Sequence, residues 1–187
     1  MSVKESATVN QSSPIALVTG ASSGIGAATT VRLVREGYHV HALARRAERL
    51  DALKSQLKAD AKGRLTTHAM DVTDSEAVTE LAQSISPVDV LINNAGLGRM
   101  DDILANSSIA DITDTINTNV TASMVTARAV LPAMINQSRG HIVNLGSMAG
   151  LYPLAAASYG ASKGAIHLLS LNLRLELKGS GVRVTEI

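Results

Sequence analysis

The stretch TGASSGIG, residues 19–26, lies between a short apolar segment and an amphipathic one, and it decides the fold that we expect. The apolar residues before it are typical of a buried strand, and the spacing after it predicts a helix over 24–36. Gly20 permits a tight turn, Gly24 lets a phosphate approach the backbone, and Gly26 lets the helix pack close to the strand.

The start of this predicted helix is suited to holding a negative charge. Its first N–H groups have no partner within the helix, and the positive end of the helix dipole points the same way. The stretch therefore predicts a turn that binds the pyrophosphate of a dinucleotide, with an ordinary strand-to-helix turn as the alternative. The candidate cofactor-binding residues of the turn are Gly20, Ser22, Ser23, Gly24, Ile25 and Gly26.

The rest of the chain alternates short apolar segments with longer helical ones. Strands are predicted over 15–18, 38–43, 65–70, 88–92, 141–145 and 182–187. Helices are predicted over 46–58, 75–84, 109–135 with a break near Asn117, and 158–178. This alternation predicts an α/β fold: a Rossmann-like, doubly wound parallel sheet with helices on both faces, in three layers. We expect a flexible N-terminal arm over 1–13 and one dinucleotide-binding domain over 14–187.

The composition excludes several classes of protein. With 45% hydrophobic and 18% charged residues among 187, the chain is not of the disordered type. A net charge of +1, three Tyr and no Phe or Trp argue against nucleic-acid binding. There is no Cys, no apolar run near the ~20 residues of a membrane helix, and no signal peptide core. We therefore expect a cytoplasmic protein that binds neither membrane nor nucleic acid.

The residues after the second predicted strand indicate which dinucleotide is bound. NAD-binding relatives of this fold carry an acidic residue about 20 positions past the glycines, whereas residues 41–46 hold no carboxylate. Arg45 is placed to pair with a 2′-phosphate, and Ser22 adds a hydroxyl. The pattern favours NADP(H) over NAD(H); the alternative is that Arg45, Arg46 and Arg49 form a solvated helix face.

Five further motifs resemble the short-chain dehydrogenase/reductase family. They are Asp71-Val72 after the third strand, NNAG at 93–96, Asn119 in INTNV at 116–120, Ser147 after the fifth strand, and YGASK at 159–163. Together with the glycine turn they extend the resemblance from Thr19 to the C-terminus. The last third resembles members that act on hydroxy acids and small alcohols.

The resemblance implies roles for these residues. The implied catalytic residues are Ser147, Tyr159, Lys163 and Asn119, which respectively orient the substrate oxygen, exchange its proton, hold the nicotinamide ribose and position a water. The implied cofactor contacts beyond the turn and Arg45 are Asp71, Val72, Asn93, Ala95, Gly96, Tyr159 and Lys163. Among them, Asn93 braces the backbone between strands, while Ala95 and Gly96 let the cofactor lie close.

Tyr159 and Lys163 are four positions apart, so they share one face of a helix. A free tyrosine keeps its proton until about pH 10, and a nearby ammonium favours the phenolate. The pair could exchange a proton with an alcohol or carbonyl oxygen while hydride moves to or from nicotinamide. We therefore expect an NADP(H)-dependent oxidoreductase of secondary alcohols or hydroxy acids. A helix-packing tyrosine with a solvated lysine, a non-catalytic NADP(H)-binding protein, and an epimerase or dehydratase are the alternatives.

The sequence departs from the family pattern in two places. Ser147 and Tyr159 are 12 positions apart, one fewer than is usual, and the family's C-terminal substrate segment does not follow Ile187.

The helix over 158–178 is apolar nearly all round, which predicts a homodimer or homotetramer. The five His residues show no metal-ligand grouping, so we expect no metal.

Overall fold

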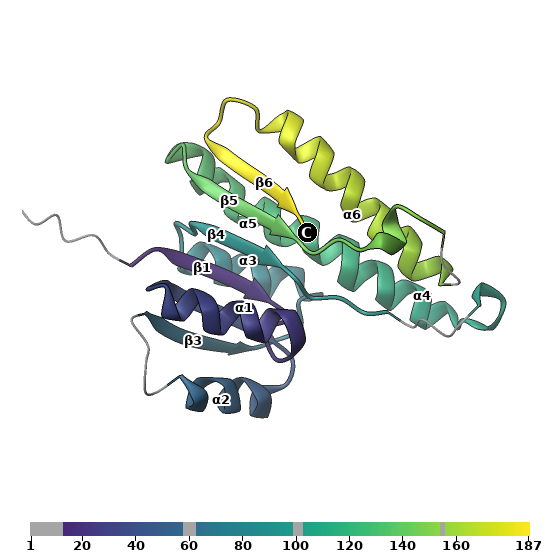
Figure 1. Ribbon diagram of the computed structural model, residues 1–187, viewed down its shortest axis with the longest axis horizontal. Helices are drawn as coiled ribbons and strands as arrows, with labels where there is room; N and C mark the ends of the chain where they lie inside the picture. The colour runs from purple at the N-terminus through teal and green to yellow at the C-terminus, as the bar shows by residue number, and fades with distance from the viewer. Residues whose placement is uncertain (1–12, 58–62, 99–102, 154–155) are drawn as a thin grey trace, which may run out of the picture.

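A computed structural model describes residues 13–57, 63–98, 103–153 and 156–187, and shows one six-stranded sheet (Figure 1). The strand order is β3-β2-β1-β4-β5-β6, and neighbouring strands are parallel. The strands are β1 Ile15–Thr19, β2 His39–Ala44, β3 Arg64–Ala69, β4 Val90–Asn93, β5 Gly140–Asn144 and β6 Val182–Glu186. This is the doubly wound sheet predicted from the sequence, with each predicted strand found within two residues of its expected bounds.

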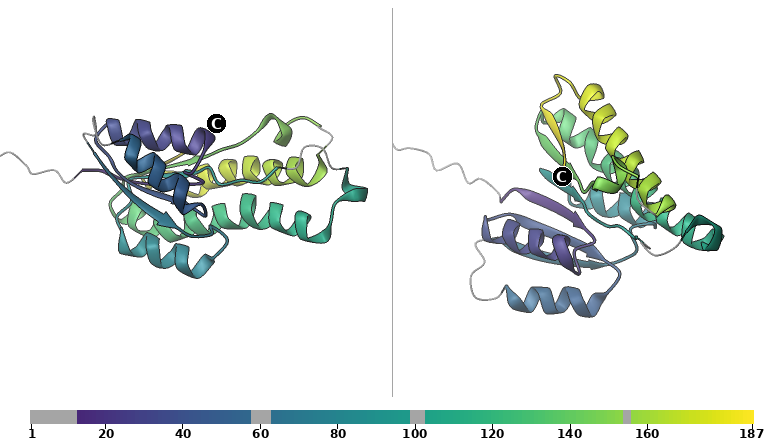
Figure 2. Two further views of the ribbon diagram at one scale, coloured as in Figure 1. Left: turned by 90° about the horizontal axis from the view of Figure 1, so that it is seen from below. Right: turned by 45° about the vertical axis from the view of Figure 1, so that its right-hand side comes forward.

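Helices cover both faces of the sheet (Figure 2). They are α1 Gly24–Arg35, α2 Ala47–Gln56, α3 Ser75–Ser84, α4 Ile109–Ile116, α5 Ala122–Asn136 and α6 Ala157–Glu176. α1 and α2 lie on one face, and α3, α5 and α6 on the other, as right-handed crossovers require when the strand order reverses after β3. The predicted three-layer α/β/α architecture is therefore confirmed.

The sheet separates two apolar cores because successive side chains of a strand point to opposite faces. On one face Leu17, Leu91 and Ile142 are fully buried with residues of α3, α5 and α6. On the other, Val18 and Val40 pack with residues of α1 and α2. Burial on both faces explains why the central strands are almost continuously apolar.

A wide π-helical turn, η2 Asn117–Thr121, joins α4 to α5 and matches the break predicted near Asn117. Such turns insert an extra residue into a helix and often occur at functional sites. Here the turn directs Asn119 into the protein, where it is 2% exposed. The irregular segment thus brings a polar side chain to the carboxyl end of the sheet.

Some of the predictions concern residues that the structure does not describe. The arm predicted over 1–13 lies outside it except for Ser13, and so does Lys58 at the end of the second predicted helix. In the part of the chain that the structure describes, none of the helices combines the length and apolar character needed to span a membrane. The division into an arm and one domain remains a prediction.

Three histidines form a ring array on β2 and β3. The centroids of His39 and His41 are 4.4 Å apart, and those of His41 and His68 are 5.2 Å apart. His41 Nδ1 lies 3.0 Å from His68 Nε2, and His39 Nε2 lies 2.8 Å from Thr66 Oγ1. Burial, then the nearby His39 and His68, lower the pKa of His41 to about 4. Among the described residues, no group of three or more His, Asp or Glu side chains is arranged to hold a metal.

The array predicts loss of stability in acid. Because the native pKa of His41, about 4, lies below its ordinary 6.5, its stabilising contribution is complete above pH 6.5 and is lost as the pH falls toward 4. Between pH 7.5 and pH 5, His41 should reduce the free energy of unfolding by about 2 kcal/mol. Urea unfolding of the wild type and of His41→Gln at both pH values measures this, and an equal pH dependence in the two proteins would contradict it.

Candidate active site

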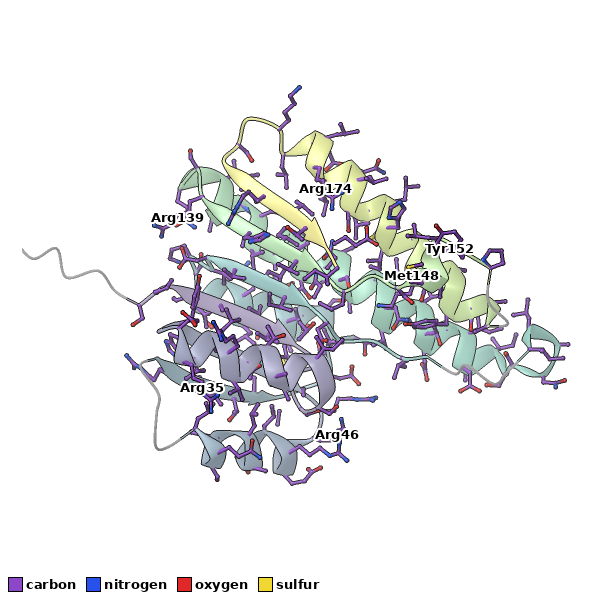
Figure 3. All side chains as sticks on the ribbon, viewed as in Figure 1. Arg35, Arg46, Arg139, Met148, Tyr152 and Arg174 are labelled. Atoms are coloured by element: carbon purple, nitrogen blue, oxygen red, sulfur yellow. The ribbon has the colours of Figure 1, made fainter. Side chains whose placement is uncertain are left out.

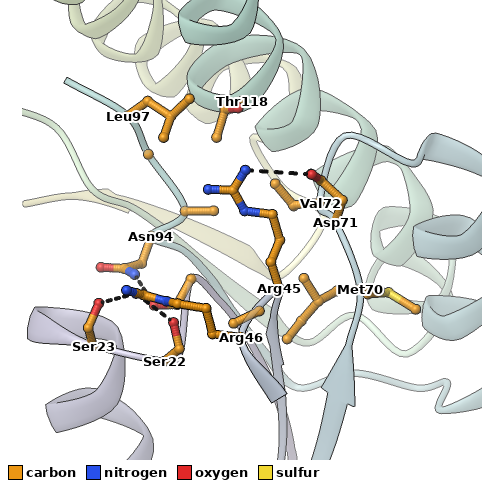
Figure 4. A pocket seen from close by; sticks show the side chains of 15 residues that line it. Ser22, Ser23, Arg45, Arg46, Met70, Asp71, Val72, Asn94, Leu97 and Thr118 are labelled. Atoms are coloured by element: carbon orange, nitrogen blue, oxygen red, sulfur yellow. Dashed lines mark hydrogen bonds and ion pairs between the residues drawn. The ribbon is translucent and has the colours of Figure 1, made fainter. Parts of the chain in front are cut away.

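The crevice of the fold lies where the strand order reverses, between β1 and β4. In doubly wound sheets the connections leave this point in opposite directions, so the carboxyl ends of the two strands stay open. A cavity of about 190 Å³ lies there (Figure 4). Its lining comes from the turn after β1, the ends of β2 and β3, the loop after β4 and the π-helical turn η2, including Gly20, Ser22, Ser23, Arg45, Arg46, Asp71, Val72, Asn94, Ala95, Gly96 and Thr118.

The glycine turn has the geometry that its spacing predicts. Gly20 and Gly24 adopt φ angles of +65° and +55°, which side chains rarely tolerate. A Cβ at Gly20 would come within 2.7 Å of Asn94, and one at Gly26 would collide with the carbonyl oxygen of Gly20. A Cβ at Gly24 would meet no described atom within 4 Å, so the backbone there is open to a ligand.

Thr19 and Asn94 fasten the loop after β4 to the glycine turn. Thr19 Oγ1 accepts the N–H groups of Asn94 and Ala95, each at 3.0 Å. The Asn94 side-chain amide donates to the carbonyl oxygens of Thr19, at 3.0 Å, and Gly20, at 3.2 Å. Asn94 was not among the predicted site residues, although it is the second Asn of the NNAG motif.

Asn93, the first Asn of this motif, braces the elements on the other side. Its amide donates to the Ser123 carbonyl on α5 at 3.2 Å and to Asn144 Oδ1 on β5 at 3.0 Å. Asn144 in turn donates to Ser170 on α6 at 2.9 Å. The bracing role expected for Asn93 therefore has a geometric basis, as part of a buried polar chain that joins β4, β5, α5 and α6.

Two guanidinium groups lie at the carboxyl end of β2 (Figure 4). Arg46 Nη2 donates to Ser22 Oγ at 3.0 Å and to Ser23 Oγ at 2.9 Å, which joins the start of α2 to the glycine turn. Arg45 extends over the crevice, with Nη1 3.8 Å from Asp71 Oδ2. The sequence assigned only Arg45 to this site, and the missed signal for Arg46 is its position as the N-cap of α2, two residues after β2.

α6 brings Tyr159 and Lys163 to the same edge of the sheet. Lys163 Nζ lies 5.8 Å from the centroid of the Tyr159 ring and donates to the Leu145 carbonyl at 2.6 Å. Lys163 is 7% exposed, and this burial lowers the pKa of its ammonium, whereas the Glu186 carboxylate acts in the opposite direction. The pair predicted from the i, i+4 spacing is thus formed.

Ser147 begins a short 3-10 helix, η3 Met148–Gly150, after β5. Its Oγ accepts the Ala149 N–H at 3.1 Å and donates to no described residue, so the hydroxyl proton is available to a substrate oxygen. The apolar side chains of Met148 and Tyr152 follow it and are 65% and 61% exposed (Figure 3). They are available to contact the carbon skeleton of a substrate.

The loop after β4 passes close to the Tyr159 ring at Gly98. A Cβ at Gly98 would lie 2.9 Å from Tyr159 Cδ2 and 3.0 Å from Cε2, which is closer than side chains tolerate. The absence of a side chain at this position therefore permits the observed placement of the Tyr159 ring. Gly98 was not among the predicted site residues.

Asn119 clamps the same loop to α6. Its Oδ1 accepts the Leu97 N–H at 2.7 Å, while Nδ2 donates to the Leu97 carbonyl at 2.8 Å and to Ser162 Oγ at 2.9 Å. Ser162 donates in turn to the Tyr159 carbonyl at 2.7 Å. The Asn119 side chain is thus committed to protein partners, and the water-positioning role implied by the resemblance remains a prediction.

A family model described as short chain dehydrogenase matches residues 14–187. This match covers the sheet, the glycine turn and the Tyr159–Lys163 pair. The chain belongs to the short-chain dehydrogenase family.

Individual members of the short-chain dehydrogenase family resemble this chain closely. The NADP-dependent 3-hydroxy acid dehydrogenase YdfG of Salmonella typhi is 42% identical over 178 residues, which are 92% of this chain and 70% of that protein. A bulky-bulky ketone specific alcohol dehydrogenase from Comamonas testosteroni superposes with a TM-score of 0.89 at 35% identity, covering 93% of this chain and 71% of the other. A metagenomic short-chain oxidoreductase in complex with NADP has a TM-score of 0.88 at 38% identity, over 92% and 80%.

These comparisons confirm the predicted family and fold class. The short-chain dehydrogenase core gathers the predicted site residues along the carboxyl edge of the sheet, in two groups. The turn after β1, Arg45 and Asp71 lie on one side of the β1–β4 switch point, and Ser147, Tyr159 and Lys163 come from the segments after β5. The roles of the individual residues remain predictions, and residues 154–155 of the shortened loop lie outside the description.

Proposed function

We propose that this chain is an NADP(H)-dependent oxidoreductase that transfers hydride between nicotinamide and a secondary alcohol or hydroxy acid and its carbonyl form. The observation that carries the proposal is the pairing of Tyr159 with a buried Lys163 at the same sheet edge as the open glycine turn. Its membership of a dehydrogenase family supports the reaction type. The names of its relatives, a 3-hydroxy acid dehydrogenase and a ketone-specific alcohol dehydrogenase, support the substrate class.

The residues around the crevice fit NADP(H). Gly24 leaves open space beside the N-terminus of α1, where a pyrophosphate would lie. Arg45, Arg46, Ser22 and Ser23 supply donors for a 2′-phosphate, and residues 41–46 at the end of β2 include no carboxylate to prefer NAD(H). A relative named NADP-dependent and a similar structure in complex with NADP further support this cofactor.

The chain's own residues then handle the proton. NADP(H), when bound, supplies or accepts the hydride. Ser147 holds the substrate oxygen through its hydroxyl, and Tyr159 exchanges a proton with that oxygen. The Lys163 ammonium, 5.8 Å from the ring centroid, places a positive charge beside the Tyr159 phenol. Asn119 and Gly98 fix the Tyr159 helix and ring, so that the proton is delivered from a defined position.

The proposal includes a cytoplasmic homodimer, or a homotetramer as the alternative. The outer faces of α5 and α6 carry exposed apolar side chains, among them Met124, Leu168 and Leu175 at 46%, 57% and 73% exposure. A groove of about 560 Å³ between the two helices is lined mainly by apolar residues. An apolar surface of this kind on two neighbouring helices is typical of an interface between subunits. The lack of Cys fits a reducing compartment.

Tyr159→Phe tests the proposed base. The variant should lose at least about 100-fold in the rate of NADPH oxidation with a panel of ketones and 3-keto acids, because general acid–base catalysis contributes this much. NADPH affinity, measured by fluorescence titration, should stay within twofold. Unchanged turnover would remove Tyr159 from catalysis. Wild-type protein that binds NADPH but oxidises none with any substrate would favour the non-catalytic alternative, and conversion without net NADPH oxidation would favour an epimerase or dehydratase.

Arg45→Ala and Arg46→Ala, made separately, test the cofactor preference. Each removes a charge-assisted contact to the 2′-phosphate, so the dissociation constant for NADPH should rise about tenfold or more while that for NADH changes little. Isothermal titration with both nucleotides measures the two constants. Arg49→Ala, on the exposed side of α2, is the matched control. Equal weakening of NADPH and NADH binding would contradict the assignment.

Leu168→Arg with Leu175→Arg tests the subunit interface. The double variant should shift the protein from dimer or tetramer mass to monomer mass in multi-angle light scattering, because each change buries a charge in an apolar contact. Ile109→Arg, at an 80% exposed site on α4, is the control and should leave the mass unchanged. A wild-type protein that runs as a monomer would refute the predicted assembly.

A further inference from the structure

The inner face of α6 is polar where it crosses the carboxyl ends of β5 and β6. Lys163 donates to the Leu145 carbonyl at 2.6 Å, and Ser170 accepts from Asn144 at 2.9 Å. Between them, His167 Nδ1 lies 2.9 Å from Oε2 of Glu186. Lys163 and His167 are one helical turn apart, so Glu186 meets the face of α6 that carries the lysine.

Glu186 is the last residue of β6 and is held in a confined position. Its side chain is 15% exposed. Its carboxylate lies over Gly146, where a Cβ would come within 2.5 Å of Oε1 and 2.9 Å of Cγ. Gly146 stands between Leu145, which accepts from Lys163, and Ser147. The absence of a side chain at residue 146 therefore lets a carboxylate approach the centre of the site.

Lys163 needs a compensating charge. Its ammonium is nearly buried, and its one hydrogen bond to a described residue goes to a neutral carbonyl. Burying a charge without a counter-ion costs free energy, and this lowers the pKa of a buried lysine. Around it, α6 carries Tyr159 and His167, β6 carries Glu186, and α4 carries Asp111 and Asp114, while His141 of β5 lies at the opposite end of that strand. Of the carboxylates, Glu186 is the one whose charge acts on Lys163 and favours its ammonium.

We propose that Glu186, tethered by His167 and seated on Gly146, is a positioning residue that keeps Lys163 protonated and directed at the end of β5. The carboxylate acts through the lysine and touches neither substrate nor cofactor. Its importance for turnover rests on the proposed function, in which the ammonium acts beside the Tyr159 phenol. The effect on the charge of Lys163 does not depend on that function.

NMR titration of the lysine side chains tests the proposal directly. The full chain has six lysines, so with ¹³Cε-labelled lysine the Lys163 signal can be assigned from Lys163→Arg. In Glu186→Gln the Lys163 midpoint should fall by about one pH unit relative to wild type, because the carboxylate no longer favours the ammonium. Glu80→Gln, which removes an exposed carboxylate on α3, should leave it unchanged. Equal midpoints in wild type and Glu186→Gln would overturn the proposal.

A second variant covers the case in which Glu186→Gln does not fold. His167→Gln keeps the carboxylate but removes the imidazole that holds it, and should lower the Lys163 midpoint by a smaller amount. A drop in melting temperature with an unchanged midpoint in either folded variant would show a merely structural pair and overturn the proposal.

Turnover gives an independent readout. The ratio of kcat for Glu186→Gln to kcat for wild type should fall as the pH rises through the variant's Lys163 midpoint, while the ratio for Glu80→Gln stays constant. A constant ratio for both variants would overturn the link to catalysis. Absence of turnover in the wild type would refute the proposed function and leave the NMR result to decide the charge of Lys163.

Discussion

The contacts of Thr19 and Asn94 between the loops after β1 and β4 are the constraint on which the site depends. At this point the sheet reverses its order and no crossover covers the strand ends, so side chains must hold the two loops together. The same contacts fix the carbonyl groups of the glycine turn and the start of the segment that reaches Gly98. One set of short polar contacts therefore sets both the glycine turn and the wall beside Tyr159.

A second group of polar contacts fixes the reacting side chains from behind. Asn119 links the loop after β4 to Ser162, and Asn93 and Asn144 link two strands to α5 and α6. Burying an amide side chain costs free energy unless it is hydrogen-bonded, and each such hydrogen bond restricts the position of the elements that it joins. The buried polar side chains of Asn93, Asn119 and Asn144 thus align the elements around the site.

Much of the fold and part of the site follow from local sequence. The glycine spacing, the alternation of strands and helices and the Tyr159–Lys163 interval each act over a few residues, so the turn, the sheet and the pair could be predicted. Arg46 was missed because its direction depends on how the start of α2 faces the glycine turn, 23 positions earlier. Glu186 was missed because its partner His167 is 19 positions away and the two meet only when β6 packs under α6.

The carbonyl of Gly20 shows how closely the parts of the turn depend on one another. It accepts a hydrogen bond from Asn94, and the space that a side chain at residue 26 would need is taken by that carbonyl and that amide. Substitutions at positions 20, 26 and 94 should therefore not have independent effects, because a change at one position alters the space available to side chains at the other two. Coupling of this kind predicts that, among related chains, the three positions change together if they change at all.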